Sequence, residues 1–151
     1  MTETASRPSN DATDDLKAVA ELMASLDICM LTTRTENGSM RGRPMSNNGE
    51  VEYDGDSWFF ARDNSRKIGE IEAEPSVGLA FIATEQVTWI NVEGHATVVR
   101  DDVERKRALW QKDLERWFDN GPEDPEVVLI KVSAVHIDAW GGEEDRSFDV
   151  R

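Results

Sequence analysis

The sequence predicts a mainly β, α+β fold in which about six antiparallel strands close into a barrel flanked by helices. Short apolar segments rich in β-branched and aromatic residues recur along the chain, with turn residues between them. Two of these segments flank Glu36-Asn37-Gly38, a hairpin signal because Asn and Gly tolerate positive φ. The 151 residues suit one domain with one core. Closing about six strands into a barrel would remove their exposed edges.

The first third of the chain predicts a leader, a helix and a hairpin, in that order. Residues 1–13 are polar and acidic, which is typical of a disordered leader. Apolar residues at helical spacing predict a helix over 14–26. Strands are expected over 28–35 and 40–46, on the two sides of the hairpin turn.

The rest of the chain alternates strands with two further helices. Gly94 lies inside the longest strand pattern before the last helix, which indicates a bulge in a curved sheet. Pro75 ends the shorter helix, and Gly121-Pro122 ends the longer one. We expect strands over 57–62, 77–84, 86–100 and 127–140, helices over 64–73 and 101–118, and a polar tail over 142–151.

Composition excludes several classes of function. A net charge of −14 and a pI of about 4.5 disfavour general binding to nucleic acid or to an anionic membrane. Any bound anion must therefore be held by a local cluster of cations. A single cysteine, Cys29, rules out an intramolecular disulfide and fits a reducing compartment. With no signal-like start and no apolar run of membrane length, we expect a cytoplasmic protein.

The segment 59–67 is the best candidate for binding chemistry. It runs from an apolar strand through a polar turn into a helix start, where unpaired amides attract anions. Ser65 adds a hydroxyl, while Arg66 and Lys67 add two positive charges suited to phosphate. The alternative is an ordinary capped helix with solvated basic residues, and the residues alone do not separate the two interpretations.

Other candidate residues are less specific. Arg43 lies on a strand whose Pro44 removes a backbone donor, so it either faces a ligand or protects a sheet edge. Trp89 is more often a packing residue, and His95 a structural histidine. No zinc-like cluster of Cys and His, nucleophile elbow, Walker A loop or dinucleotide fingerprint is present, so we expect no metal and assign no catalytic residue.

Four segments in order resemble one family. They are RGRPM at 41–45, SWFFARDNSRKIGEIEAEPSVGLAF at 57–81, VTWINVEGHATVVRD at 87–101 and VSAVHIDAW at 132–140. Together they resemble the pyridoxamine 5′-phosphate oxidase-like FMN-binding split barrels, and most of all the short general stress protein 26 branch. The resemblance covers about residues 14–141. It implies a six-stranded antiparallel split β-barrel of Greek-key type that binds two FMN molecules at a homodimer interface.

The resemblance also implies a role for each matching residue. Arg43, Pro44 and Met45 of the first segment would contact the flavin and its ribityl chain. The strand end at Phe60 and Ala61 would contact the ring, and the following turn would bind the phosphate through Ser65, Arg66 and Lys67. Trp89, across the dimer interface, and Trp140 would lie near the ring.

The resemblance implies an FMN-dependent oxidoreductase acting on a small redox substrate or on NAD(P)H. Two features depart from the true pyridoxamine phosphate oxidases. The substrate-gripping Arg-x-His element is absent, so we do not expect oxidation of vitamin B6. Asp63 places a negative charge in the phosphate turn. The alternatives are a non-catalytic stress or redox-sensing flavoprotein, and a split barrel that binds the deazaflavin F420 or haem.

Overall fold

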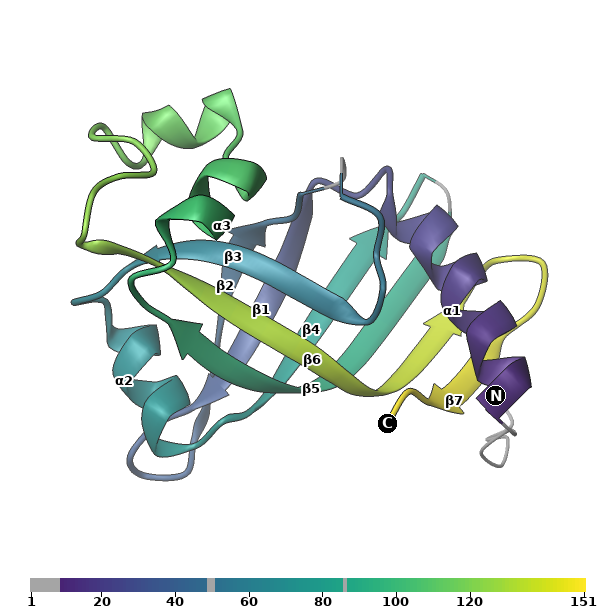
Figure 1. Ribbon diagram of the computed structural model, residues 1–151. Helices are drawn as coiled ribbons and strands as arrows, with labels where there is room; N and C mark the ends of the chain where they lie inside the picture. Colours follow the sequence, from purple (N-terminus) through teal and green to yellow (C-terminus); the bar gives the residue numbers. More distant parts are fainter. Residues whose placement is uncertain (1–8, 49–50, 86) are drawn as a thin grey trace.

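The computed structural model describes residues 9–48, 51–85 and 87–151. Over these residues the chain forms one curved antiparallel sheet with strand order β2-β1-β4-β5-β6-β3, and β7 pairs with the C-terminal part of β6. Helix α1 lies at one end of the sheet, and α2 and α3 lie at the other (Figure 1). The elements are α1 (Ser9–Met23), β1 (Ile28–Arg34), β2 (Met40–Ser46), β3 (Asp56–Arg62), α2 (Arg66–Ala73), β4 (Ser76–Ala83), β5 (Thr88–Val99), α3 (Val103–Leu109), the 3₁₀ helix η1 (Lys112–Arg116), β6 (Val127–Trp140) and β7 (Arg146–Asp149).

The core lies inside the curved sheet, because alternate side chains of each strand point inward. In β5 every second residue from Thr88 to Ala96 is buried, and in β3 the inward residues include Phe59 and Ala61. Ile68 and Ile71 of α2 close one end of the core. The mainly β split barrel expected from the sequence is therefore confirmed.

Two glycines take the roles expected of them. Gly38 has a φ of +80° and donates its amide to Thr35 O at 2.9 Å, which closes the β1–β2 hairpin. The β5–β6 register shifts between Glu93 and Gly94, which is the predicted bulge. A Cβ at Gly94 would lie 2.6 Å from Val132 Cγ1, so any other residue there would force its neighbours to shift.

Three expected boundaries differ from the structure. The first helix starts at Ser9, inside the expected leader 1–13, while residues 1–8 lie outside the described residues. The expected polar tail 142–151 contains β7, because Phe148 is completely buried against the core and its backbone pairs with β6. The expected helix 101–118 is split into α3 and η1, since Trp110 adopts an extended backbone at the end of α3.

Candidate functional site

A cavity of about 550 Å³ opens between β2, β3 and the segment that holds α3 and η1. Its volume lies in the range of small-molecule sites. Six of the residues expected to bind a cofactor line it: Pro44, Met45, Phe60, Ala61, Ser65 and Lys67. These come from positions far apart in the sequence, and the sheet brings them to one place. We call this space the β2–β3 cavity.

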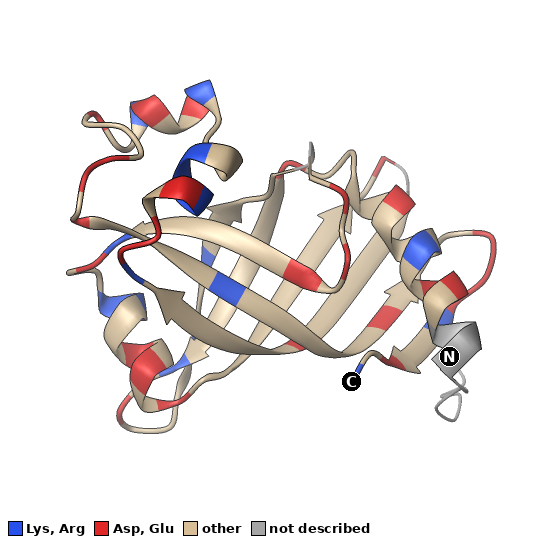
Figure 2. Ribbon diagram, viewed as in Figure 1, with Lys and Arg blue, Asp and Glu red and all other residues tan. Residues whose placement is uncertain are grey.

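The charge of the β2–β3 cavity is opposite to that of the chain. Among its lining residues the charged side chains are Arg62 and Lys67, with no aspartate or glutamate. The chain as a whole has 31 acidic residues against 17 Lys and Arg. Acidic residues are spread over most other parts of the molecule (Figure 2). An anionic ligand would therefore find its most favourable local environment in this cavity.

One end of the cavity lies at the start of α2. Ser65 is the N-cap residue, with an extended backbone, but its hydroxyl gives the helix amides no side-chain cap. Its Oγ instead donates to Arg62 O at 2.7 Å. The amide groups of the first turn of α2 are therefore left without the side-chain partner that usually satisfies them. Such a helix start favours a phosphate group.

Lys67 is partly buried at this end of the cavity. Burial lowers the pKa of its ammonium group, and the positive charge of Arg43 lowers it further. Arg43 does not line the cavity. Its Nη2 lies 3.1 Å from Glu70 Oε1 and its Nη1 donates to Leu31 O at 3.2 Å, while Thr33 Oγ1 also donates to Glu70 at 2.7 Å. Glu70 is therefore paired with Arg43 and Thr33.

Asp63, the acid in the expected phosphate turn, faces a different partner. Arg100 Nη2 lies 2.7 Å from Asp63 Oδ1, and Arg100 Nη1 lies 2.9 Å from Glu72 Oε2. Hydrogen bonding from Arg100 lowers the pKa of the Asp63 carboxyl. The negative charge in the turn is thus balanced outside the cavity. Sequence reasoning missed Arg100, which is 37 residues away from Asp63.

Aromatic side chains also line the cavity, among them Phe60 and Phe118. The ring of Phe60 meets Trp110 edge to face at 5.1 Å and lies 6.4 Å from Phe118. Lys106 anchors this aromatic wall, because its buried Nζ donates to Asp124 O at 3.0 Å and to Val127 O at 2.9 Å, which ties α3 to the start of β6. The sequence assigned Phe60 to the ligand, but it placed Trp110 and Phe118 only in the expected helix 101–118.

Besides Arg43, three of the expected cofactor residues lie outside the lining of this cavity in the single chain. Arg66 is exposed and lines a separate hollow together with Glu70 and Glu74. Trp89 and Trp140 are cross-strand partners. Trp140 lies on β6, 12 residues after Val128, and Val128 is the β6 partner of the cavity residue Ala61. One chain therefore does not bring these tryptophans to the β2–β3 cavity.

Other chemistry is not indicated by the part of the chain that the structure describes. Over residues 9–48, 51–85 and 87–151, no group of three or more His, Cys, Asp or Glu side chains is arranged to hold a metal ion. Cys29 is buried in the core, and burial raises the pKa of its thiol to about 12, as expected of an inert cysteine. None of the described helices combines the length and apolar character needed to span a bilayer.

The chain is a small antiparallel split barrel with a cavity whose described lining holds cationic and aromatic side chains and no acid. The chain belongs to the pyridoxamine 5′-phosphate oxidase-like family, whose model matches residues 14–149. The match includes β7, which lies beyond the residues 14–141 covered by the resemblance in the sequence.

Individual relatives agree with this assignment. The chain is 28% identical over 127 residues to protein bli-3 of Neurospora crassa. The aligned region covers 78% of this chain and 60% of that protein. The chain therefore spans less than two thirds of the length of this curated relative. A general stress protein 26 structure from Bacillus anthracis is 25% identical with a TM-score of 0.74, covering 88% of this chain and 98% of that one.

Two more distant structures share the fold. One is a Clostridium acetobutylicum protein described as related to general stress protein 26, with 20% identity, a TM-score of 0.75 and coverage of 91% and 95% of the two chains. The other is a Nostoc punctiforme protein described as FMN binding, with 16% identity, a TM-score of 0.66 and coverage of 93% and 88%. Most of the chain therefore adopts the fold of this family, and its structural neighbours include general stress protein 26 structures.

Proposed function

We propose that the chain is an FMN-binding oxidoreductase whose flavin occupies the β2–β3 cavity. The observation that carries the proposal is the pairing, in one cavity, of an acid-free cationic end with an aromatic wall. FMN needs both, because it joins a phosphate to a flat apolar ring. The FMN-binding description of the Nostoc punctiforme structure, which has the same fold, supports the choice of ligand.

The lining residues fit the parts of FMN. Lys67, the Ser65 hydroxyl and the first amides of α2 would hold the phosphate. Pro44, Met45 and the strand end at Phe60 and Ala61 would contact the ribityl chain and the ring. Bound flavin supplies hydride or electron transfer. The protein's part is to orient it, to exclude water with the aromatic wall, and to keep carboxylates away from the phosphate.

We also propose that the protein works as a homodimer. The register of β4, β5 and β6 aligns Ile82, Trp89 and Trp140 across the sheet, and the β1–β4 register, continued by two residues, would bring Ile28 opposite Ile82. Ile28 is 54% exposed, Ile82 57% and Trp89 39%, so the row forms an apolar strip on the outer face. A second copy would cover this strip and would bring its tryptophans toward a flavin site. Analytical ultracentrifugation tests this, because Ile82→Asp should shift a dimer to monomer.

Haem and F420 fit the cavity less well than FMN. No histidine lines the β2–β3 cavity among the described residues, so haem would have no histidine axial ligand there. F420 has a longer and more acidic tail than FMN, and the cavity offers only Arg62 and Lys67 as cations within its described lining. Both observations favour FMN.

Flavin binding and flavin turnover need separate experiments. Titration of the purified chain with FMN, followed by flavin absorbance and fluorescence, tests the site, and saturable binding at one FMN per chain is expected. Anaerobic mixing of the loaded protein with NADH or NADPH then tests the enzyme. Bleaching of the flavin and reoxidation over repeated turnovers support an oxidoreductase, whereas a flavin that stays oxidised supports the redox-sensing alternative.

A further inference from the structure

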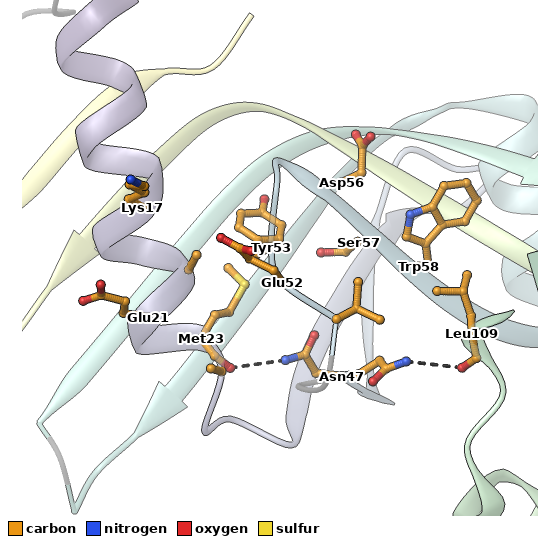
Figure 3. Close-up of a pocket in the computed structure, with 14 residues that line it drawn as sticks. Lys17, Glu21, Met23, Asn47, Glu52, Tyr53, Asp56, Ser57, Trp58 and Leu109 are labelled. Atoms are coloured by element: carbon orange, nitrogen blue, oxygen red, sulfur yellow. Dashed lines mark hydrogen bonds between the residues drawn. The ribbon is translucent and has the colours of Figure 1, made fainter.

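A second cavity, of about 380 Å³, lies beside the β2–β3 cavity and has a different charge. Helix α1 forms one wall, and residues 51–53 with the start of β3 form the other (Figure 3). Its lining includes the acids Glu21, Glu52 and Asp56 and one lysine, Lys17. Trp58 is one of the residues that line both cavities. We call this space the α1–β3 cavity.

The inner end of the α1–β3 cavity holds hydroxyl groups without partners. Ser57 is only 6% exposed, and its Oγ has no hydrogen-bond partner among the described residues. The same holds for the buried hydroxyl of Tyr53, whose pKa is raised by burial so that it stays protonated. Figure 3 shows the Ser57 hydroxyl turned toward Tyr53 and Glu52. Unpaired buried hydroxyls are unfavourable, and a ligand that approaches them would relieve that cost.

The acids of this cavity differ in how well they are balanced. Asp56 is paired, with Arg151 Nη2 at 3.0 Å and Lys131 Nζ at 3.7 Å. Glu52 is exposed, has no ion-pair partner within the described residues and extends toward α1 (Figure 3). Met23 and the indole of Trp58 also line this cavity and supply apolar surface. The site therefore combines an exposed carboxylate without an ion-pair partner, a buried hydroxyl without a hydrogen-bond partner, and apolar side chains.

We propose that the α1–β3 cavity binds a small organic amine. Its ammonium group is held by Glu52 and the Ser57 hydroxyl, and its apolar body packs against Met23 and Trp58. This assignment does not rest on the flavin proposal, because its residues differ from those that hold the phosphate. It places a cationic ligand next to the cavity that favours an anion, and Trp58 lines both cavities.

The test compares three probes of one shape and different charge: benzylamine, benzyl alcohol and benzoate. Each is titrated into the ¹⁵N-labelled full chain, and binding is followed by amide shifts of residues 52–58 and of α1. We expect benzylamine to bind about tenfold or more tightly than benzoate, because the probe charge is reversed beside Glu52. Glu52→Gln and Ser57→Ala should each weaken benzylamine by about 3- to 10-fold. Glu36→Gln, an exposed acid at the hairpin tip, should leave it unchanged.

A cavity-filling variant makes the location testable without loss of the fold. Ala20→Leu adds volume to the α1 wall with a residue that is still a strong helix former. It should abolish benzylamine binding while the amide spectrum stays dispersed. The proposal is overturned if benzoate binds as tightly as benzylamine, if no probe shifts the named residues, or if Ala20→Leu or the paired Glu52→Gln and Ser57→Ala variants bind benzylamine as the natural chain does.

Discussion

Replacing Lys67 by glutamine tests which cation holds the FMN phosphate. Lys67 is the cation at the α2 end of the β2–β3 cavity, and no carboxylate lines that cavity within the described residues. Glutamine keeps the polar tip and most of the length of lysine, so the change removes mainly the charge. Arg43 remains paired with Glu70, because their contact at 3.1 Å does not involve Lys67.

The size of the effect follows from the bond that is lost. A hydrogen bond to a charged group is worth about 1.5–3 kcal/mol. Since about 1.4 kcal/mol corresponds to a tenfold change in affinity, Lys67→Gln should raise the FMN dissociation constant about 10- to 100-fold. Riboflavin lacks the phosphate, so its dissociation constant should change by less than about threefold.

The assay is a flavin fluorescence titration with FMN and with riboflavin, using the natural chain and each variant. Arg66→Gln is the informative comparison, because Arg66 is exposed and lines a different hollow. It should weaken FMN less than about fivefold, as expected of a solvent-exposed ion pair. Lys17→Gln on α1, an exposed lysine outside the lining of the β2–β3 cavity, serves as the distant charge control. Equal losses of FMN and riboflavin in Lys67→Gln, or an unchanged FMN affinity, would refute the assigned phosphate position.

Three further predictions concern the scaffold. Lys106→Met should lower the free energy of unfolding in urea by about 2–4 kcal/mol, because two buried carbonyls lose their donor. An unchanged midpoint of urea unfolding would contradict this role of Lys106. Burial lowers the pKa of His136, but its two aspartate partners outweigh this and raise it above 6.5. The protonated imidazole therefore stabilises the fold fully below about pH 6.5, and this stabilisation is lost as the pH rises through the raised pKa. The difference in free energy of unfolding between the natural chain and His136→Asn should be larger at about pH 5.5 than at about pH 8.5. Gly94→Ala should cost about 1–3 kcal/mol because its Cβ would meet Val132 at 2.6 Å, whereas Gly78→Ala, with its nearest neighbour atom at 3.9 Å, should cost less.

The strands and the bulge could be predicted because they follow from local chemistry. The alternation of buried and exposed residues along β5 repeats every two residues, which is visible in the sequence. The Asn-Gly turn and Gly94 are also local signals, and both occur where expected. The β2 and β6 boundaries agree with the predicted ranges 40–46 and 127–140.

The missed features depend on contacts between distant parts of the chain. β7 is four residues long and has one buried apolar residue, Phe148, too short a pattern to distinguish from a polar tail. The break at Trp110 arises where its ring packs on Phe60, across 50 positions of sequence. The pairing of Asp63 with Arg100 depends in the same way on how α2 sits beside β5.

Part of the candidate site could be predicted because some of its residues follow one another in the sequence. The strand–turn–helix segment 59–67 indicated an anion site locally, and its Ser65 and Lys67 line the cavity. Arg66 faces elsewhere because consecutive residues at a helix start point in different directions. The α1–β3 cavity had no signal in the sequence, since its walls come from α1, the loop before β3 and α3.

The most direct test of the central claim is the mass of the cofactor released when the natively purified protein is denatured. The account predicts FMN, at one molecule per chain, either as purified or after reconstitution with excess FMN. Release of haem or F420 would contradict it, as would a protein that retains no FMN after reconstitution.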